Sequence, residues 1–327
     1  MKDLAKCQLC PWNCKANRLE GEMGVCHSGL PEVAYTGLTP VLKTFAVTLL
    51  ACSFRCIYCN AYRISQYPDS GWIYRGYVPP DKLVSEVMNA FTTSFAQKIG
   101  VKKLSFTGGE PSINTPYLEE IVKMLGEDLP DLEVGVATNG FCTHSTMQRL
   151  EKFSNYLNFE IKAFNNELHQ AITGAPVENV LENAEWLGRN HPEKIRVFRT
   201  VVIPGINDSE IPQIARFLHD IDPNLPYRLV GFRPHFMLYY HPAPSRDYMQ
   251  KLVRECRDMG LENVDYSGYY PGGNLIMDSS LKNGLKNSNR ILNQAGCYRS
   301  PRICGDCPEN GSCPAIVLEP WTNLPQE

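Results

Sequence analysis

The stretch TLLACSFRCIYCNAYRISQ, residues 48–66, places three cysteines within eight positions, directly after an apolar run. They are Cys52, Cys56 and Cys59, and the aromatic Tyr58 precedes the last of them. Structural metal sites are usually closed by four ligands, whereas catalytic sites keep one position open. Three thiolates can each bind one iron of a [4Fe–4S] cube and leave the fourth iron free for a small molecule. The alternative is a zinc site that takes its fourth ligand from a distant part of the chain.

Cysteine is unusually frequent, with 13 in 327 residues, and eleven of these fall into three tight groups. The N-terminus shows no apolar stretch of signal-peptide length, so we expect a cytoplasmic protein whose thiols stay reduced. Clustered cysteines in such a protein indicate metal binding or redox chemistry more than disulfides. The two further groups flank the first, and their members are Cys7, Cys10, Cys14 and Cys26 at one end and Cys297, Cys304, Cys307 and Cys313 at the other.

Each flanking group has four cysteines, which is enough to close a metal site. The N-terminal spacing fits zinc, a single iron or a [4Fe–4S] cluster. For the C-terminal group we predict an auxiliary [4Fe–4S] cluster, with a purely structural metal clip as the alternative. Cys142 and Cys256 stand alone and are predicted to be buried apolar residues.

Composition is that of an ordinary soluble globular enzyme, with 43% hydrophobic and 20% charged residues. The net charge of −3 gives no reason to expect nucleic acid or an anionic membrane as a partner. The longest apolar run, residues 41–51, is interrupted by Lys43 and is far shorter than the roughly 20 residues of a membrane span.

Between the first and last cysteine groups, β-rich runs alternate with segments that have helical periodicity. The expected strands are 45–51, 102–108, 132–139, 157–164, 194–203 and 227–234, and the expected helices lie within 79–100, 114–128, 143–153, 177–189, 209–220 and 245–260. Six β–α units predict a parallel sheet with right-handed crossovers, either open or closed into a barrel. In both cases ligands bind at the carboxyl ends of the strands.

The cysteine spacing of the first stretch, with an aromatic before the last thiol, resembles the signature of the radical SAM superfamily. FTGGEP, residues 106–111, resembles that family's glycine-rich turn, which binds S-adenosylmethionine (SAM). Residues 1–275 further resemble pyruvate formate-lyase activating enzymes and activase-like proteins, through CSFRCIYCNAYRISQ, FEIKAFNNELHQAITGAPVENVLENAEWL, FRTVVIPGINDS and the N-terminal CQLCPWNCKANRLEGEMGVC.

The resemblance implies an α/β fold with a partial (β/α)6 TIM-type barrel and small cysteine-rich metal-binding segments at both termini. We accordingly expect a four-cysteine metal-binding segment at 1–40, a radical SAM core barrel at 41–275 and an auxiliary-cluster segment at 276–327.

The resemblance also implies roles for individual residues. Cys52, Cys56 and Cys59 would bind the catalytic cluster. The others would bind SAM: Tyr58 near the adenine, Gly108, Gly109 and Glu110 at the methionine part, and Asn139 and Lys162 at later strand ends, where ribose and carboxylate contacts are expected. Arg199 is a further candidate for binding SAM. Alternatives for two of these are a solvent-exposed Lys162 at a strand edge and an Arg199 engaged in an internal salt bridge. Glu160 stands where relatives carry an aspartate, which puts any ion site on that carboxylate in doubt.

His235 lies in RPHFMLYYH, residues 233–241, directly after the sixth expected strand. It is a candidate proton donor or substrate contact at the barrel mouth. The alternative is that this segment is a packed aromatic loop.

The implied activity is reductive cleavage of SAM to a 5′-deoxyadenosyl radical, which abstracts hydrogen from a substrate. A low-potential donor such as ferredoxin or flavodoxin would supply the electron. The activase likeness favours a protein or peptide substrate. Two alternatives are the oxidation or rearrangement of a small molecule with an auxiliary cluster, and a non-catalytic iron–sulfur binding or sensing protein. The sequence does not identify the substrate.

Overall fold

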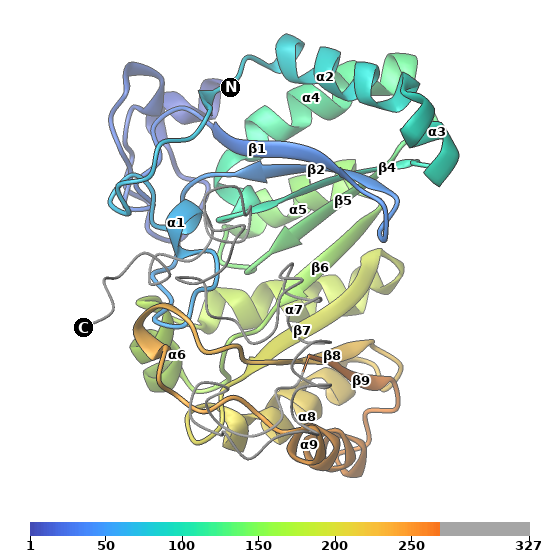
Figure 1. The fold of residues 1–327 in the computed structure, drawn as a ribbon. Coiled ribbons are helices and arrows are strands. Elements are labelled where there is room, and N and C mark those ends of the chain that lie inside the picture. Colours follow the sequence, from blue (N-terminus) through green and yellow to red (C-terminus); the bar gives the residue numbers. More distant parts are fainter. Residues whose placement is uncertain (269–327) are drawn as a thin grey trace, which may run out of the picture.

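A curved, mostly parallel sheet forms the centre of the molecule (Figure 1). The computed structural model describes residues 1–268. Its nine strands there have the order β3-β1-β2-β4-β5-β6-β7-β8-β9. Their bounds are β1 Glu32–Thr39, β2 Thr44–Leu49, β3 Gly76–Tyr77, β4 Lys103–Gly108, β5 Glu133–Thr138, β6 Tyr156–Glu160, β7 Ile195–Val202, β8 Tyr227–Gly231 and β9 Val264–Ser267. β1 pairs antiparallel with β2 and β3, and every neighbouring pair from β2 to β9 is parallel.

Helices connect the parallel strands and line the outer side of the sheet (Figure 1). Their bounds are α1 Tyr62–Ser65, α2 Pro80–Thr92, α3 Ser94–Ile99, α4 Thr115–Asp128, α5 His144–Phe153, α6 Asn166–Thr173, α7 Glu178–Asn190, α8 Ile211–Ile221 and α9 Arg246–Asp258. Successive members of this layer contact each other, α2 with α4, α4 with α5, α5 with α7, α7 with α8 and α8 with α9. Each presents an apolar face to the sheet, as amphipathic helices do in a β–α repeat.

The fold class expected from the sequence is confirmed, because the six predicted strands all pair in parallel as β2 and β4 to β8. Three strands were not predicted. β3 and β9 have two and four residues, too few for a periodic signal, and β1 is half-exposed over most of its length. Two predicted strands extend too far, since β6 ends at Glu160 and β8 at Gly231. The residues beyond those ends form loops at the carboxyl edge of the sheet.

The helix expected within residues 79–100 is divided in two at Thr93. This residue has an extended ψ of 145°, and its side chain accepts a hydrogen bond from the Ala96 amide, which caps α3. A threonine hydroxyl at such a position competes with the helical hydrogen bond, so the chain restarts there.

The expected boundaries at residues 40 and 275 stay predictions. β1 lies before the first boundary and pairs with β2 after it. The expected segment 276–327 falls outside the described residues. Across residues 1–268, no helix combines the length and apolar character needed to cross a membrane.

Burial of aromatic side chains in the sheet should dominate the stability of the fold. Phe106 on β4 is completely buried, whereas Phe95 on α3 is 50% exposed. We expect Phe106→Ala to lower the free energy of unfolding by about 3–5 kcal/mol, because it leaves a cavity in the core. Phe95→Ala should cost about 1 kcal/mol at most. Urea denaturation of the two variants under oxygen-free conditions measures the difference, and equal losses would contradict this placement of the core.

Candidate active site at the carboxyl ends of the parallel strands

The loop after β2, residues 50–61, carries the three closely spaced cysteines. We call it the cluster loop. The backbone amides of Arg55 and Ile57 donate hydrogen bonds to the carbonyls of Thr173 and Ile172, at 2.7 and 3.0 Å. These carbonyls belong to the last turn of α6, where helix carbonyls lack partners within the helix. The cluster loop is therefore held by a segment more than 100 residues further along the chain.

The three thiols of the cluster loop are shielded from water. Cys52 and Cys56 are buried, and Cys59 is partly buried. Burial raises the pKa of all three, that of Cys56 to about 12, and for Cys52 the nearby Glu110 carboxylate raises it further. The thiols are thus neutral until a cation binds, and iron binding releases their protons.

In residues 1–268, no three Cys, His, Asp or Glu side chains converge so as to bind one metal ion. The thiolates of an iron–sulfur cube bind different irons, so they do not need to meet at one point. Three thiols in one buried loop are a suitable donor set for three corners of a cube.

The glycine-rich turn at the end of β4 lies directly against the cluster loop. A Cβ atom added to Gly108 would lie 2.2 Å from the Leu49 carbonyl oxygen, and one added to Gly109 would lie 1.7 Å from that of Ala51. Gly108 also has a φ of +123°, which residues with side chains rarely adopt. The amides of Gly109 and Glu110 donate to the Leu49 and Ala51 carbonyls, both at 2.9 Å. Glycine is needed at both positions because the backbone of the turn lies directly against that of the cluster loop and leaves no space for a Cβ atom.

Glu110, the last residue of this turn, is 1% exposed and joins the ends of two strands. Its carboxylate accepts hydrogen bonds from the Ser112 amide (2.9 Å), the Thr138 hydroxyl (2.7 Å) and the Asn139 amide (2.7 Å). Burial raises its pKa, while these three donors lower it. The three donors to the Glu110 carboxylate all belong to this chain, so in this structure Glu110 fixes the turn. A contact between Glu110 and the methionine part of SAM stays a prediction.

Asn139, directly after β5, connects that strand to the cluster loop. Its side-chain amide donates to the Ser53 hydroxyl at 3.1 Å and to the Cys52 sulfur at 3.7 Å. Its side-chain oxygen accepts from the Phe141 amide at 2.9 Å. The side chain predicted to contact SAM therefore also orients a thiol of the cluster loop.

Glu160, Lys162 and Arg199 form an ion-pair group at the end of β6 and the middle of β7. Lys162 pairs with one carboxylate oxygen of Glu160, and Arg199 lies 2.9 Å from the other. Burial alone would raise the pKa of Glu160, but the two cations hold it at about 2. Lys162 is largely buried, not at a solvent-exposed edge, and its charge acts on Cys56 and Tyr58. Arg199 makes the internal salt bridge that was its alternative role; contacts of either cation with SAM stay predictions.

Several buried polar atoms at the site have no hydrogen-bond partner. They include the hydroxyl of Tyr58, which is 6% exposed, and Nε2 of the fully buried His169. Burial lowers the pKa of His169 to about 4, so its ring is neutral near pH 7. Buried polar groups are normally satisfied. The Tyr58 hydroxyl, next to Cys59 in the chain, is a suitable partner for a polar group of SAM.

His235 lies in a loop that packs against α1. It is 4% exposed, and its ring is 6.0 Å from that of Tyr62. The next residue, Phe236, stacks on Tyr62 at 4.5 Å. This packing matches the alternative of an aromatic loop, and a role of His235 in proton donation stays a prediction.

Arg63 on α1 is a site residue that the sequence did not indicate. It is 4% exposed, and its guanidinium lies 4.1 Å from the centre of the Trp72 ring. Its Nη1 and Nη2 atoms are buried without a hydrogen-bond partner, and within residues 1–268 it forms no ion pair. A buried guanidinium that has no ion-pair partner and two nitrogens without hydrogen bonds is a suitable binding group for an anionic ligand. An arginine four residues after the last cysteine gives no signal of such burial.

The N-terminal group of four cysteines lies at the same end of the sheet, beside the cluster loop (Figure 1). Cys7, Cys10 and Cys26 are buried and Cys14 is partly buried. The indole nitrogen of Trp12 donates to the Ser53 carbonyl at 2.9 Å. The C-terminal group, Cys297, Cys304, Cys307 and Cys313, lies outside the described residues. Cys142 and Cys256 are completely buried, as predicted.

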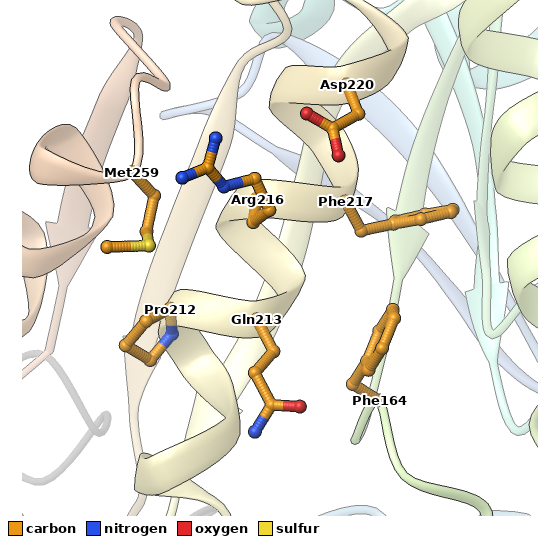
Figure 2. A pocket seen from close by; sticks show the side chains of 7 residues that line it. All are labelled: Phe164, Pro212, Gln213, Arg216, Phe217, Asp220 and Met259. Atoms are coloured by element: carbon orange, nitrogen blue, oxygen red, sulfur yellow. The ribbon is translucent and has the colours of Figure 1, made fainter.

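A surface pocket of about 430 Å³ lies elsewhere, over α8 (Figure 2). Its lining consists of Phe164, Pro212, Gln213, Arg216, Phe217, Asp220 and Met259. None of these is a cysteine or a predicted SAM contact, so this pocket is separate from the site described above.

Comparison with known proteins gives one family match and several relatives. The model of the radical SAM superfamily matches residues 47–218, from β2 to α8. GTP 3′,8-cyclases of Limosilactobacillus fermentum and Listeria monocytogenes are each 30% identical, over 68% and 78% of this chain and 64% and 72% of their own lengths. An isethionate sulfite-lyase activating enzyme of Desulfovibrio desulfuricans is 29% identical over 42% of this chain and 44% of its own length. A solved domain of a pyruvate-formate lyase-activating enzyme from Bacteroides vulgatus covers 50% of this chain and 98% of that domain, with 22% identity and a TM-score of 0.42.

A methyl group at Gly109 should displace the cluster loop. We expect Gly109→Ala to weaken SAM binding at least about tenfold, equivalent to about 1.4 kcal/mol, because the Ala51 carbonyl must move away. Gly126→Ala on α4 is the matched control, since nothing lies within 4 Å of its added Cβ. Titration of SAM into the reduced, oxygen-free proteins, followed by electron paramagnetic resonance, measures the binding. Equal affinities in the two variants would show that this close contact is not needed.

Proposed function

Because the chain belongs to the radical SAM superfamily, we propose that it cleaves SAM reductively at a [4Fe–4S] cluster held by Cys52, Cys56 and Cys59. The observation that supports this site is the direct contact of the three-cysteine loop with the glycine-rich turn at the carboxyl ends of the parallel strands. When bound, the cluster supplies the electron that cleaves SAM into methionine and a 5′-deoxyadenosyl radical, which abstracts hydrogen from the substrate.

The protein's contribution is to hold and shield these groups. The contacts that fix the cluster loop include those with α6, with the glycine-rich turn and with Asn139. The backbone of residues 108–110 would bind the SAM ammonium, while the Glu110 carboxylate accepts hydrogen bonds from Ser112, Thr138 and Asn139 and so keeps the turn in place. Burial of the thiols excludes water and oxygen from the reacting atoms. Ferredoxin or flavodoxin remains our proposal for the electron donor.

For the substrate, we propose a small anionic molecule. The two GTP 3′,8-cyclases support a small molecule over the protein or peptide expected from the sequence. Arg63 supports a negative charge, because its buried guanidinium lacks an anionic partner within the described part of the chain. A triphosphate, a carboxylate or a sulfonate would each satisfy it.

A protein or peptide substrate is the second candidate. It is supported by the isethionate sulfite-lyase activating enzyme, which is 29% identical over a shorter part of the chain. A non-catalytic iron–sulfur protein, the third alternative, would need neither a SAM-binding turn nor the open corner of a cube.

Production of 5′-deoxyadenosine tests the proposed activity. We expect the reconstituted chain to form it from SAM and dithionite without oxygen, and Cys56→Ala to reduce the rate at least about 100-fold, since one iron loses its ligand. Cys256→Ala, which removes a buried thiol of α9 far along the chain, is the control for general damage. Absence of 5′-deoxyadenosine from the intact, iron-loaded chain would leave only the sensing alternative.

The substrate class can be tested with cell extract separated by ultrafiltration. We expect the small-molecule fraction, not the protein fraction, to increase 5′-deoxyadenosine formation. Arg63→Met should abolish this increase while leaving the slow cleavage without substrate unchanged, because it removes the charge that binds the anion. The control is Arg189→Met, which changes an arginine that is 50% exposed. Stimulation by the protein fraction alone would favour the second candidate.

A further inference from the structure

Arg18, between the third and fourth cysteines of the N-terminal group, is completely buried. Its guanidinium has five N–H groups, and each finds an acceptor. The partners are the Gly29 carbonyl (2.7 Å), the Ile113 carbonyl (2.5 Å), the Ser28 hydroxyl (2.8 Å), the Asn114 side-chain oxygen (2.6 Å) and the Cys7 sulfur (3.8 Å). The hydrogen bonds are complete, but the four oxygen acceptors are neutral.

Within residues 1–268, no carboxylate pairs with Arg18. A buried charge without a counter-charge is strongly unfavourable, even when it is fully hydrogen-bonded. Groups near Arg18 that can become anionic are the cysteines of the N-terminal group, of which Cys7 accepts a hydrogen bond from Arg18. Neutral thiols do not balance the charge, whereas thiolates bound to a metal centre do.

The four sulfurs lie in one buried region, but they do not converge on a single point. A Cβ added to Gly24 would lie 3.1 Å from the Cys14 sulfur and 3.4 Å from that of Cys26, so both sulfurs face this glycine. Yet in the described part of the chain no three such side chains could hold one metal ion. Cys52, Cys56 and Cys59, at which we propose the catalytic cube, share this property. Tetrahedral zinc requires four sulfurs at about 2.3 Å from one ion.

We propose that Cys7, Cys10, Cys14 and Cys26 bind a second [4Fe–4S] cluster, whose negative charge neutralises Arg18. Four protein thiolates close this cluster, so it has no open iron for SAM. The hydrogen bond from Arg18 to Cys7 and the positive charge both favour the reduced cluster and raise its reduction potential.

This centre also supports the SAM-binding turn. Arg18 donates to the Ile113 carbonyl and the Asn114 side chain, just after the glycine-rich turn. Cys26 packs with Ala51 of the cluster loop and with Ile113. Loss of the second cluster leaves Arg18 without its counter-charge and loosens these contacts.

The test uses the full chain, reconstituted with iron and sulfide without oxygen. Cys14→Ser, which changes the most exposed of the four, should lose about four irons and four sulfides relative to the wild type. Cys256→Ala is the control and should lose none. If Cys14→Ser loses one zinc and keeps its iron, the site binds zinc and the proposed cluster is wrong. If Cys14→Ser keeps both its iron and its zinc, the proposal that these four cysteines bind a metal centre is wrong. Because iron and sulfide are counted, this result does not depend on SAM cleavage or on the substrate.

Chemical labelling of the wild type covers the case in which Cys14→Ser does not fold. In the iron-loaded chain, the Cys14 thiol should resist iodoacetamide, and it should react after iron is chelated. Mass spectrometry of the peptide that contains Cys14 measures this change. Equal labelling before and after chelation would overturn the proposal.

The role of Arg18 is tested by the reduction potential of the second cluster, measured by redox titration in a chain in which the cysteines of the two other groups are replaced by alanine, namely Cys52, Cys56, Cys59, Cys297, Cys304, Cys307 and Cys313. Arg18→Met should make the potential more negative, and Arg18→Lys should restore part of the difference, because it keeps the charge. The control is Arg149→Met, a partly exposed arginine already paired with Glu119. An unchanged potential in Arg18→Met would show that this arginine does not neutralise the cluster.

Discussion

The contact between two backbones, the cluster loop and the glycine-rich turn, is the constraint on which the site depends. Gly108 and Gly109 leave no room for a side chain because the Leu49 and Ala51 carbonyls occupy that space. Two amide hydrogen bonds fix the contact. Parallel pairing of β2 and β4 brings their carboxyl ends to the same edge, which is why a cysteine loop and a glycine turn that are distant in the sequence can meet.

Buried charge is the second feature that organises the site, and the buried cations near the site differ in the partners that surround their charges. Lys162 and Arg199 both pair with the single carboxylate of Glu160, so each has an anionic partner within the chain although the group keeps one net positive charge. Arg18 has a full set of hydrogen bonds but no carboxylate, and Arg63 lacks partners for two of its nitrogens. Because uncompensated buried charges are costly, we propose that bound anionic groups complete the structure at Arg18 and Arg63.

The sequence match shows the family of the chain, whereas its substrate is a proposal. The β–α framework, the three-cysteine loop and the glycine turn agree with the family match over residues 47–218. The relatives include cyclases that act on a nucleotide and activating enzymes, and they share this framework. A common core with different substrates is the usual situation in folds of this kind, because specificity lies in groups added around the strand ends. In this chain the N-terminal cysteines lie outside the residues that match the family.

The sequence by itself determined the parallel β–α order, the three thiols and the glycine turn, because hydrophobic periodicity and short spacings are local properties of the chain. It did not reveal β1 and β3, the support of the cluster loop by α6, or the partners of Glu110 and Lys162. It also gave no signal for the burial of Arg18 and Arg63. These features depend on which residues meet across the sheet, and contacts such as Arg18 with Ile113, 95 positions apart, exist only in the folded chain. Burial and charge balance are set by such distant neighbours, so only the tertiary structure decided them.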